Sequence, residues 1–509
     1  MGFKAITASV GTTDTLLTTM PAFFTGAVVL ALSNVNTSTA QTLTLKLQRN
    51  GSLAKETIGG LEIAAKAAVK YPAPIGLESG DSLWAVATSA NDIKVTGSLV
   101  DGSQPTSSFA LEELYSAKFV YDQQTATPDA AVSNSVPSLV MSGLFDSIRG
   151  CVVNSSGIRS YYLNPTNWAQ KIDGSASVLT GADGDVMVEI PAFYYRTQWM
   201  GQTLIREISP VQLPGFTLHP AFIKDGVKVP YRYCGAYDAC TYDVSASEYV
   251  SGLNWDNNSD PDGVAVDVTA STGDQLRSVK GIYPMVGLTR NEFRILAANR
   301  GTAFRQLDFT LWSAIQMLFM VEYQTLFSQR ELGNGNVAGS YPGSSGVQED
   351  SPHVIAGISD GTANSSTNST SGADYMRYRG IENIYGNCWT WSDGINVNVS
   401  GTGNVHVTNN RSDFADDVTT NLELLTSELT TESNYIKEFL PLDWASLAKT
   451  TGGGSTTYVT DRHYGSGAAA RVVLVGGSAL NGANAGLFSV LATRSSASAD
   501  RIIGARLCC

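Results

Sequence analysis

The sequence predicts an α+β protein in which an N-terminal antiparallel β-sandwich precedes a larger α+β domain. Short segments that alternate apolar and polar residues fill residues 1–102, whereas the two strongest helix signals occur much later in the chain. Charged residues make up only 16% of the 509 residues and glycine occurs 49 times, a composition that favours strands joined by many loops. We therefore expect strand-rich domains, with helices confined to the larger one.

The first domain is expected to span residues 1–102. Gln41–Gln48 places Leu43, Leu45 and Leu47 on one face, as in a strand that buries one side. Several similar segments follow one another, separated by Gly, Asn, Asp and Ser. Such a series of short strands and turns is typical of a compact sandwich.

A connector is expected at residues 103–144, because Pro105, Pro128 and Pro137 occur there among clusters of Ser, Thr and Gln. The larger domain is then expected to occupy residues 145–509.

Two helices are predicted inside the larger domain. Thr289 and Glu292 have the spacing of a capping box, and Gly301 follows where the helix would end. The second predicted helix, roughly Asp308–Arg330, begins with an acidic capping residue and is apolar on most faces. A helix with so little polar surface is expected to be buried among other elements.

Charge and hydropathy argue against two kinds of partner. A net charge of −13 disfavours binding to nucleic acid, which requires clustered Lys and Arg. The longest apolar run, residues 311–327, is interrupted by Gln and Glu and is shorter than the roughly 20 apolar residues of a membrane span. The first residues lack the basic and apolar regions of a secretion signal. We therefore expect no nucleic acid partner and no membrane insertion.

Two segments of the larger domain carry a distinctive pattern. Ile384–Gly394 contains two tryptophans two positions apart, which a strand would bury on one face. Near the end of the chain an apolar strand precedes a glycine pair, and a final strand reads Gly-Ala-Arg. The residues of this pattern are Gly386, Asn387, Trp389, Trp391, Asp393, Gly476, Gly477, Gly504 and Arg506.

This ordered pattern resembles C-type-lectin-like domains of two kinds, the formylglycine-generating-enzyme-like domains and the tropism determinants of bacteriophages. Upstream segments such as Tyr161–Pro165 and Phe193–Arg196 resemble parts of phage tail and fibre proteins. The resemblance implies a bacteriophage virion structural protein, in a tail fibre, collar or similar appendage, made in the host cytoplasm. Its partners would be other virion proteins and a host cell-surface receptor, either protein or glycan. It also implies a homotrimer in which the N-terminal domain attaches to the virion.

In the tropism determinants a variable stretch before the last strand contacts the receptor. The matching stretch here is Ser478–Ser498, whose polar side chains and one aromatic ring suit adaptable binding. The alternative is an ordinary Gly/Ser/Ala loop between two core strands. The residues expected to be exposed for receptor binding are Ser478, Leu480, Asn481, Asn484, Phe488, Ser489, Arg494, Ser495, Ser496 and Ser498.

Other functions remain as alternatives. The chain could be a capsid or neck protein that braces its neighbours without binding a receptor. A formylglycine-generating-like oxidase would need cysteines to bind copper, but Cys508 and Cys509 follow the final Gly-Ala-Arg and are poorly placed to chelate one metal. No catalytic residues are carried over, so we expect a protein that is not an enzyme. Trp389 and Trp391 could stack on sugars, although the resemblance implies that they are core residues.

No cofactor is expected, apart from calcium at one candidate site. Asp256, Asp260 and Asp262 form an oxygen-rich run with Asn257 and Asn258 that could hold calcium, and turn formation is the alternative interpretation. The six cysteines do not form a disulfide framework in so long a chain and are expected to be reduced, as in a protein folded in a bacterial cytosol. The alternative is that Cys234 and Cys240 pair across a short loop.

Overall fold

The chain divides into two compact units, one formed by residues 1–116 with 137–143 and the other by residues 117–136 with 144–509. The computed structural model describes 115–131, 139–250, 266–338, 353–360 and 375–509, the strands β1 to β9, and short strands at 255–256, 260–261 and 365–366. Helix α2 (Leu139–Asp146) contributes to both units. Within the segment expected to be a connector, Ala117–Asp122 forms strand β10 of the larger unit.

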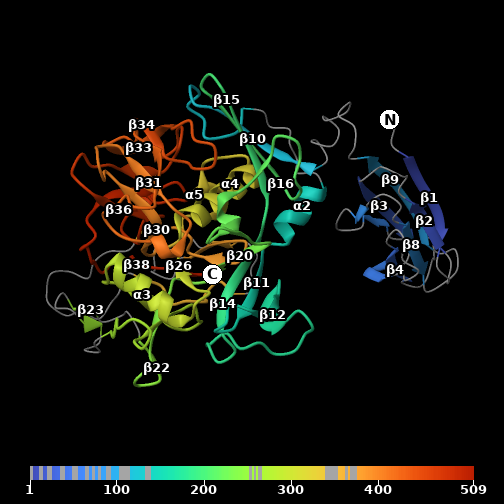
Figure 1. Ribbon diagram of the computed structural model, residues 1–509, viewed down its shortest axis with the longest axis horizontal. Helices are drawn as coiled ribbons and strands as arrows, with labels where there is room; N and C mark the ends of the chain where they lie inside the picture. The colour runs from blue at the N-terminus through green and yellow to red at the C-terminus, as the bar shows by residue number, and fades with distance from the viewer. Residues whose placement is uncertain are drawn as a thin grey trace. The chain divides into compact units, whose positions relative to one another are not determined.

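The N-terminal unit contains two antiparallel sheets (Figure 1). One has the order β1-β9-β3-β6, with β7 also pairing with β3, and the other has the order β2-β8-β4-β5. The predicted strand Gln41–Gln48 is confirmed as β4. The other strands are β1 (Lys4–Val10), β2 (Thr15–Thr19), β3 (Gly26–Asn34), β5 (Glu56–Ile63), β6 (Ala68–Lys70), β7 (Ile75–Leu77), β8 (Ser82–Ala87) and β9 (Ile93–Asp101).

Two sheets form the first part of the larger unit. A four-stranded sheet has the order β10-β16-β15-β17, with β15 (Tyr194–Met200), β16 (Thr203–Ser209) and β17 (Thr217–Leu218). A seven-stranded sheet has the order β13-β12-β11-β14-β20-β39-β26. Its strands are β11 (Arg149–Val153), β12 (Arg159–Asn164), β13 (Asn167–Lys171), β14 (Asp185–Pro191), β20 (Tyr231–Gly235), β26 (Arg305–Gln306) and β39 (Leu507–Cys508).

A nine-stranded sheet dominates the C-terminal part, with the order β32-β31-β30-β36-β37-β35-β33-β34 and with β38 beside β30. Its pairs are antiparallel except β35–β37 and β30–β38, which are parallel. The strands are β30 (Trp389–Val397), β31 (Val405–Val407), β32 (Glu423–Thr426), β33 (Ser433–Phe439), β34 (Ala448–Thr451), β35 (Arg462–Tyr464), β36 (Arg471–Val475), β37 (Val490–Arg494) and β38 (Ile503–Gly504).

Short strand pairs and triplets connect these sheets. They are β18 (Ile223–Lys224) with β19 (Val227–Lys228), β21 (Cys240–Asp243) with β22 (Glu248–Val250) and β25 (Gln275–Arg277), β23 (Trp255–Asp256) with β24 (Asp260–Pro261), and β27 (Ser365–Ser366) with β28 (Met376–Tyr378) and β29 (Ile381–Glu382).

The first predicted helix is confirmed as α3 (Arg290–Arg300). Thr289 accepts a hydrogen bond from the backbone of Glu292, the Glu292 carboxylate accepts one in return, and Gly301 follows the last turn. Both halves of the predicted capping box are therefore formed.

The second predicted helix is shorter than expected. It forms α4 (Phe309–Tyr323), in which every residue from Phe309 to Val321 is buried. It ends because Gln324 adopts a left-handed conformation (φ 58°), and a separate helix, α5 (Ser328–Leu332), follows. Helix α4 packs against β10 and β16 of one sheet and β30 of another, so the expectation of a buried helix is confirmed.

The predicted α+β class is wrong. In the described residues strands far outnumber helices, and the larger unit consists of several sheets around the buried helix α4 and the shorter helices α3 and α5 (Figure 1). The error has a local cause: many strands here are two to five residues long, too short to show alternation in the sequence. Within the described part of the chain, no helix is both long and apolar enough to cross a membrane.

Candidate functional site

The tryptophan segment forms the centre of the nine-stranded sheet. Trp389 and Trp391 lie on β30 and are buried in the same apolar cluster, together with Val472 and Leu474 of β36. The indole nitrogen of Trp391 donates a hydrogen bond to the carbonyl of Leu288 at 3.1 Å. Both rings are therefore core residues, and neither is available to stack on a sugar.

Asn387 begins a buried polar network just before this strand. It adopts a left-handed conformation (φ 53°), and its amide oxygen accepts hydrogen bonds from Asn336 and from the backbone of Val354 at 2.9 and 3.0 Å. Its amide nitrogen donates to Asp238 at 2.7 Å. Gly386 precedes it with φ 73°, and a β-carbon there would lie 2.9 Å from a backbone carbonyl oxygen.

Arg506 joins the same network from the far end of the sequence. It contacts Asp238 at 2.6 Å and donates to the backbone carbonyls of Gly235, Glu382 and Asn383. Burial raises the pKa of Asp238, and the neighbouring guanidinium opposes that shift. Asp238 thus connects the two parts of the sequence pattern, although no motif in the sequence singled it out.

The glycines of the pattern allow close approaches of the backbone. Gly476 and Gly477 have φ angles of 90° and 89°, and a β-carbon on Gly477 would lie 2.6 Å from that of Ala485. Gly504 pairs with Thr390 across the parallel strands β38 and β30. The pattern residues thus bring β30, β36 and the closing strand together.

Asp393, near the end of the tryptophan segment, holds Arg294 of helix α3. The guanidinium binds both carboxylate oxygens, at 2.7 and 2.8 Å, and the amide of Gln306 donates a further hydrogen bond at 2.8 Å. Burial opposes ionisation, but the two arginines nearby and these hydrogen bonds hold the pKa of Asp393 below its usual value. Asp393 therefore fixes the position of an arginine that also faces solvent.

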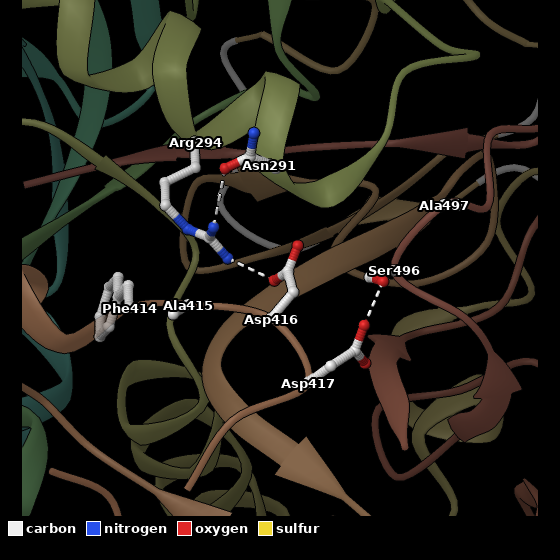
Figure 2. A pocket seen from close by; sticks show the side chains of 8 residues that line it. All are labelled: Asn291, Arg294, Phe414, Ala415, Asp416, Asp417, Ser496 and Ala497. Atoms are coloured by element: carbon white, nitrogen blue, oxygen red, sulfur yellow. Dashed lines mark hydrogen bonds and ion pairs between the residues drawn. The ribbon is translucent and has the colours of Figure 1, made fainter. Parts of the chain in front are cut away.

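Arg294 lines an open cleft with a volume of about 570 Å³ (Figure 2). Its guanidinium bridges Asn291 at 3.1 Å and Asp416 at 2.7 Å, and the Ser496 hydroxyl donates to the Asp417 carboxylate on the opposite side. The cleft is lined by Asn291 and Arg294 from α3, by residues 414–417, and by Ser496 and Ala497. The cleft thus offers hydroxyl, amide and carboxylate groups for hydrogen bonding, with Phe414 as its aromatic ring.

The stretch Ser478–Ser498 does not form one exposed loop. Ser478, Phe488 and Ser489 are fully buried, so their expected exposure is wrong. Phe488 packs against Phe319 of α4 and Phe439 of β33, because the chain turns inward here before it enters β37. The Ser489 hydroxyl donates to the carbonyl of Arg462 at 3.0 Å.

Two separate surface segments remain. The first holds Leu480, Asn481 and Asn484, all half-buried, around a short 3-10 turn at Gly482–Asn484. The second follows β37, with Ser495 exposed and with Arg494, Ser496 and Ser498 half-buried. Only this second segment borders the cleft, and its Arg494 forms an ion pair with Asp500 at 3.3 Å.

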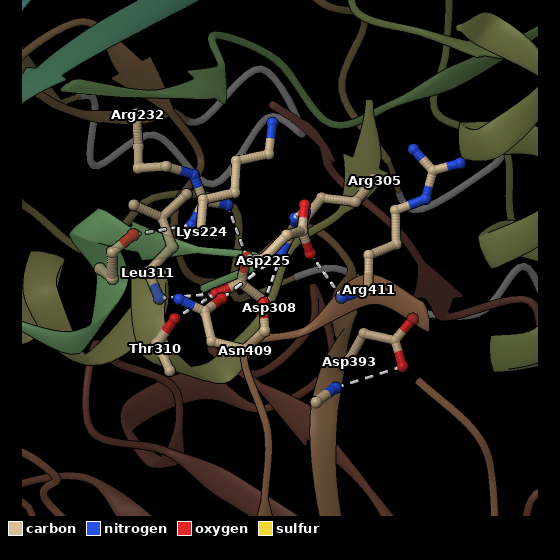
Figure 3. Close-up of polar contacts among 12 residues, drawn as sticks. Lys224, Asp225, Arg232, Arg305, Asp308, Thr310, Leu311, Asp393, Asn409 and Arg411 are labelled. Atoms are coloured by element: carbon tan, nitrogen blue, oxygen red, sulfur yellow. Dashed lines mark hydrogen bonds and ion pairs between the residues drawn. The ribbon is translucent and has the colours of Figure 1, made fainter. Parts of the chain in front are cut away.

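A second polar cluster lies around the start of α4 (Figure 3). Asp308 caps the helix by accepting from the backbone of Leu311 at 2.9 Å, and it pairs with the fully buried Arg232 at 2.6 Å. Burial disfavours the charged carboxylate, but Arg232 and Arg305 lower the pKa of Asp308 to about 2. Arg305 also pairs with Asp225 at 2.6 Å. Through Asp308 the start of α4 is thus tied to Arg232 of β20 and to Arg305 of β26.

The calcium candidates fall in a part of the chain that is described only in fragments. Asp256 and Asp260 are partners across the short pair β23–β24, and Asp262 lies outside the described residues. Among the side chains that the structure describes, no three His, Cys, Asp or Glu residues are grouped so as to hold a metal ion. All six cysteines are free and buried.

No family model matches this chain, and no curated protein matches it either. Among solved structures, the chain is similar to a protein described as Major Tropism Determinant U1 Variant, with 11% identity, a TM-score of 0.22, and coverage of 65% of this chain and 83% of that one. It is also similar to Eiger TNF from S. frugiperda, with 11% identity, a TM-score of 0.14, and coverage of 20% and 89%. At these TM-scores neither likeness supports an argument about fold or function.

Proposed function

We propose that this chain is a structural protein of a bacteriophage virion and that it binds a host-cell receptor through the cleft beside residues 494–498. The observation that carries the proposal is the position of this segment. It belongs to the stretch that the sequence resemblance assigns to receptor binding, and it borders an open polar cleft.

The scaffold beneath the cleft supports this proposal. Asp393 of the sequence pattern holds Arg294, and Arg294 in turn holds Asp416 on the cleft wall. A binding surface with little freedom to rearrange loses less entropy when it binds. Ser495 and Ser496 follow the end of β37, so we expect substitutions there to leave the buried strands intact.

We further propose that the protein acts by binding and not by catalysis. The residues that line the cleft include neither cysteine nor histidine, and the Asp416 carboxylate is already shared by Arg290 and Arg294. The thiols of Cys508 and Cys509 are buried within the seven-stranded sheet.

A binding assay with labelled full-length protein on a panel of intact bacterial strains tests the proposal. Ser496→Trp fills the cleft, and we expect it to reduce binding to a responsive strain at least tenfold. The matched control is Ser175→Trp, because Ser175 also hydrogen bonds a nearby carboxylate, that of Asp173, and is exposed outside the cleft.

Equal binding by both variants, with both folded, would contradict a receptor site in the cleft. If the wild-type protein binds no strain while remaining folded and trimeric, the chain is instead a structural protein that braces its neighbours in the virion.

A further inference from the structure

Two cysteines that lie far apart in the sequence face each other across neighbouring strands. Cys234 of β20 is the direct antiparallel partner of Cys508 of β39. Tyr233 and Cys509, the next pair along, exchange both backbone hydrogen bonds, at 2.9 and 3.0 Å. Cys234 and Cys508 therefore occupy a non-hydrogen-bonded position of the ladder, where opposite side chains approach most closely.

This position suits a disulfide. Opposite α-carbons in non-hydrogen-bonded pairs lie about 4.5 Å apart, which falls within the roughly 4.4–6.8 Å range of disulfide-bonded cysteines. The two side chains also lie close enough for each thiol to shift the pKa of the other.

The surroundings of the two thiols also favour the reaction. The hydrogen bond from Cys508 lowers the pKa of Cys234, and the guanidinium groups of Arg506 and Arg232 act in the same direction against the effect of burial. A thiolate is the nucleophile in thiol–disulfide exchange. The lowered pKa favours the thiolate form of Cys234 within this pair.

We propose that Cys234 and Cys508 form a cross-strand disulfide when the chain folds in the presence of a small-molecule disulfide oxidant such as oxidised glutathione, because both thiols are fully buried once the protein has folded. One thiolate of the pair attacks the oxidant and releases one reduced glutathione. The other cysteine sulfur then attacks the resulting mixed disulfide, as strand pairing brings the two together, and releases the second glutathione. Two protein thiols are oxidised, one glutathione disulfide is reduced, and the two cysteine protons end on the released thiols.

The bond would covalently fasten β39 to β20 in the seven-stranded sheet. A disulfide stabilises more when it closes a longer loop, and this one would enclose most of the larger unit. We expect the oxidised protein to unfold at a temperature several degrees higher than the reduced protein.

Peptide mapping of the full-length protein tests the proposal. Trypsin leaves Cys508 and Cys509 in one peptide and Cys234 and Cys240 in another, so the double variant Cys240→Ala/Cys509→Ala gives one cysteine per peptide. After refolding in the presence of oxidised glutathione, we expect a cross-linked peptide joining residues 234 and 508. Adding Cys508→Ala should remove both the cross-link and the rise in unfolding temperature.

The wild-type protein provides a measurement that does not depend on how well the variants fold. Alkylation under denaturing conditions should count six free thiols before oxidation and four afterwards. The proposal is overturned if all six remain free, or if the cross-link joins any other pair of cysteines.

Discussion

Asp238 is the residue at which Asn387 and Arg506, the two parts of the sequence pattern, meet, and its burial explains its importance. Its two carboxylate oxygens bind Asn387 at 2.7 Å and Arg506 at 2.6 Å. Arg506 is itself 1% exposed. Buried charges are tolerated only when they are paired and hydrogen bonded, so each of these residues depends on the others.

We expect Asp238→Ala to lower the free energy of unfolding by about 3–5 kcal/mol, because it leaves the Arg506 charge buried without a partner. The control is Asp129→Ala, which removes an ion pair with Arg330 whose side chains are 46% and 43% exposed. Removing this exposed ion pair should lower the free energy of unfolding by only about 0–1 kcal/mol. Urea denaturation followed by tryptophan fluorescence measures both. If both variants lowered the free energy of unfolding by similar amounts, the buried Asp238–Arg506 pair would not have the stabilising role assigned to it.

Asp461 is a buried carboxyl with few partners. It accepts a hydrogen bond from the backbone of Phe488 at 2.7 Å, and Gly486 lies so close that a β-carbon there would collide with the carboxylate. Burial raises its pKa from 3.8 to about 8, and the hydrogen bond from Phe488 opposes the shift only in part. The folded protein therefore holds a proton that the unfolded chain releases.

The pH dependence follows from this difference. Between pH 4 and pH 8 the folded state binds one more proton at Asp461 than the unfolded state, so the free energy of unfolding should fall as the pH rises. The slope approaches about 1.4 kcal/mol per pH unit. Asp461→Asn cannot titrate and should lack this contribution. Urea denaturation at a series of pH values compares the two proteins, and parallel stability curves would refute the assignment.

At the level of elements, α3 and α4 begin with the same kind of cap but in different surroundings. The cap of α3 is Thr289, a neutral side chain near the surface. The cap of α4 is Asp308, which also neutralises the buried Arg232. The local hydrogen bond is similar, whereas the electrostatic consequences differ.

Thr289→Ala should lower the free energy of unfolding by about 1 kcal/mol, the usual value of an N-cap. Asp308→Ala should lower the free energy of unfolding by about 3–5 kcal/mol, because the Arg232 side chain is 0% exposed and would lose its ion-pair partner. The two variants can be compared by urea denaturation of the full-length chain. Equal costs would show that capping alone accounts for the role of Asp308.

At the level of the whole molecule, the larger unit is organised around α4. The helix contacts strands of the four-stranded and nine-stranded sheets, and Gln316 donates to the carbonyl of Leu487 just before the turn into β37. The segment that leads to the proposed binding surface is thereby tied to the centre of the unit. A rigid scaffold of this kind suits a protein that binds through short surface segments.

The proposed homotrimer is tested by the mass of the full-length protein in solution. We expect size-exclusion chromatography with light scattering to give three times the mass of one chain. Three copies would strengthen weak receptor contacts through multivalency. A monomer or a dimer across the accessible concentration range would contradict the trimer.

Several features of the fold were determined by local sequence alone. The strand Gln41–Gln48 follows from its alternation, and α3 follows from the pairing of Thr289 with Glu292. The spacing of Trp389 and Trp391 places both rings on one face of β30, although β36 supplies the distant residues that bury them. For β4 and α3 the deciding interactions involve residues close together in the chain, so the sequence pattern carries them.

Only the tertiary structure decided the fold class, the partners of Arg506 and the exposed part of Ser478–Ser498. The short strands of the larger unit form because distant segments pair, and such pairing leaves little periodicity in the sequence. Phe488 is buried because α4 and β33 supply aromatic partners from elsewhere in the chain. The cleft likewise exists only where α3, residues 414–417 and residues 496–497 meet, since no single segment could form it.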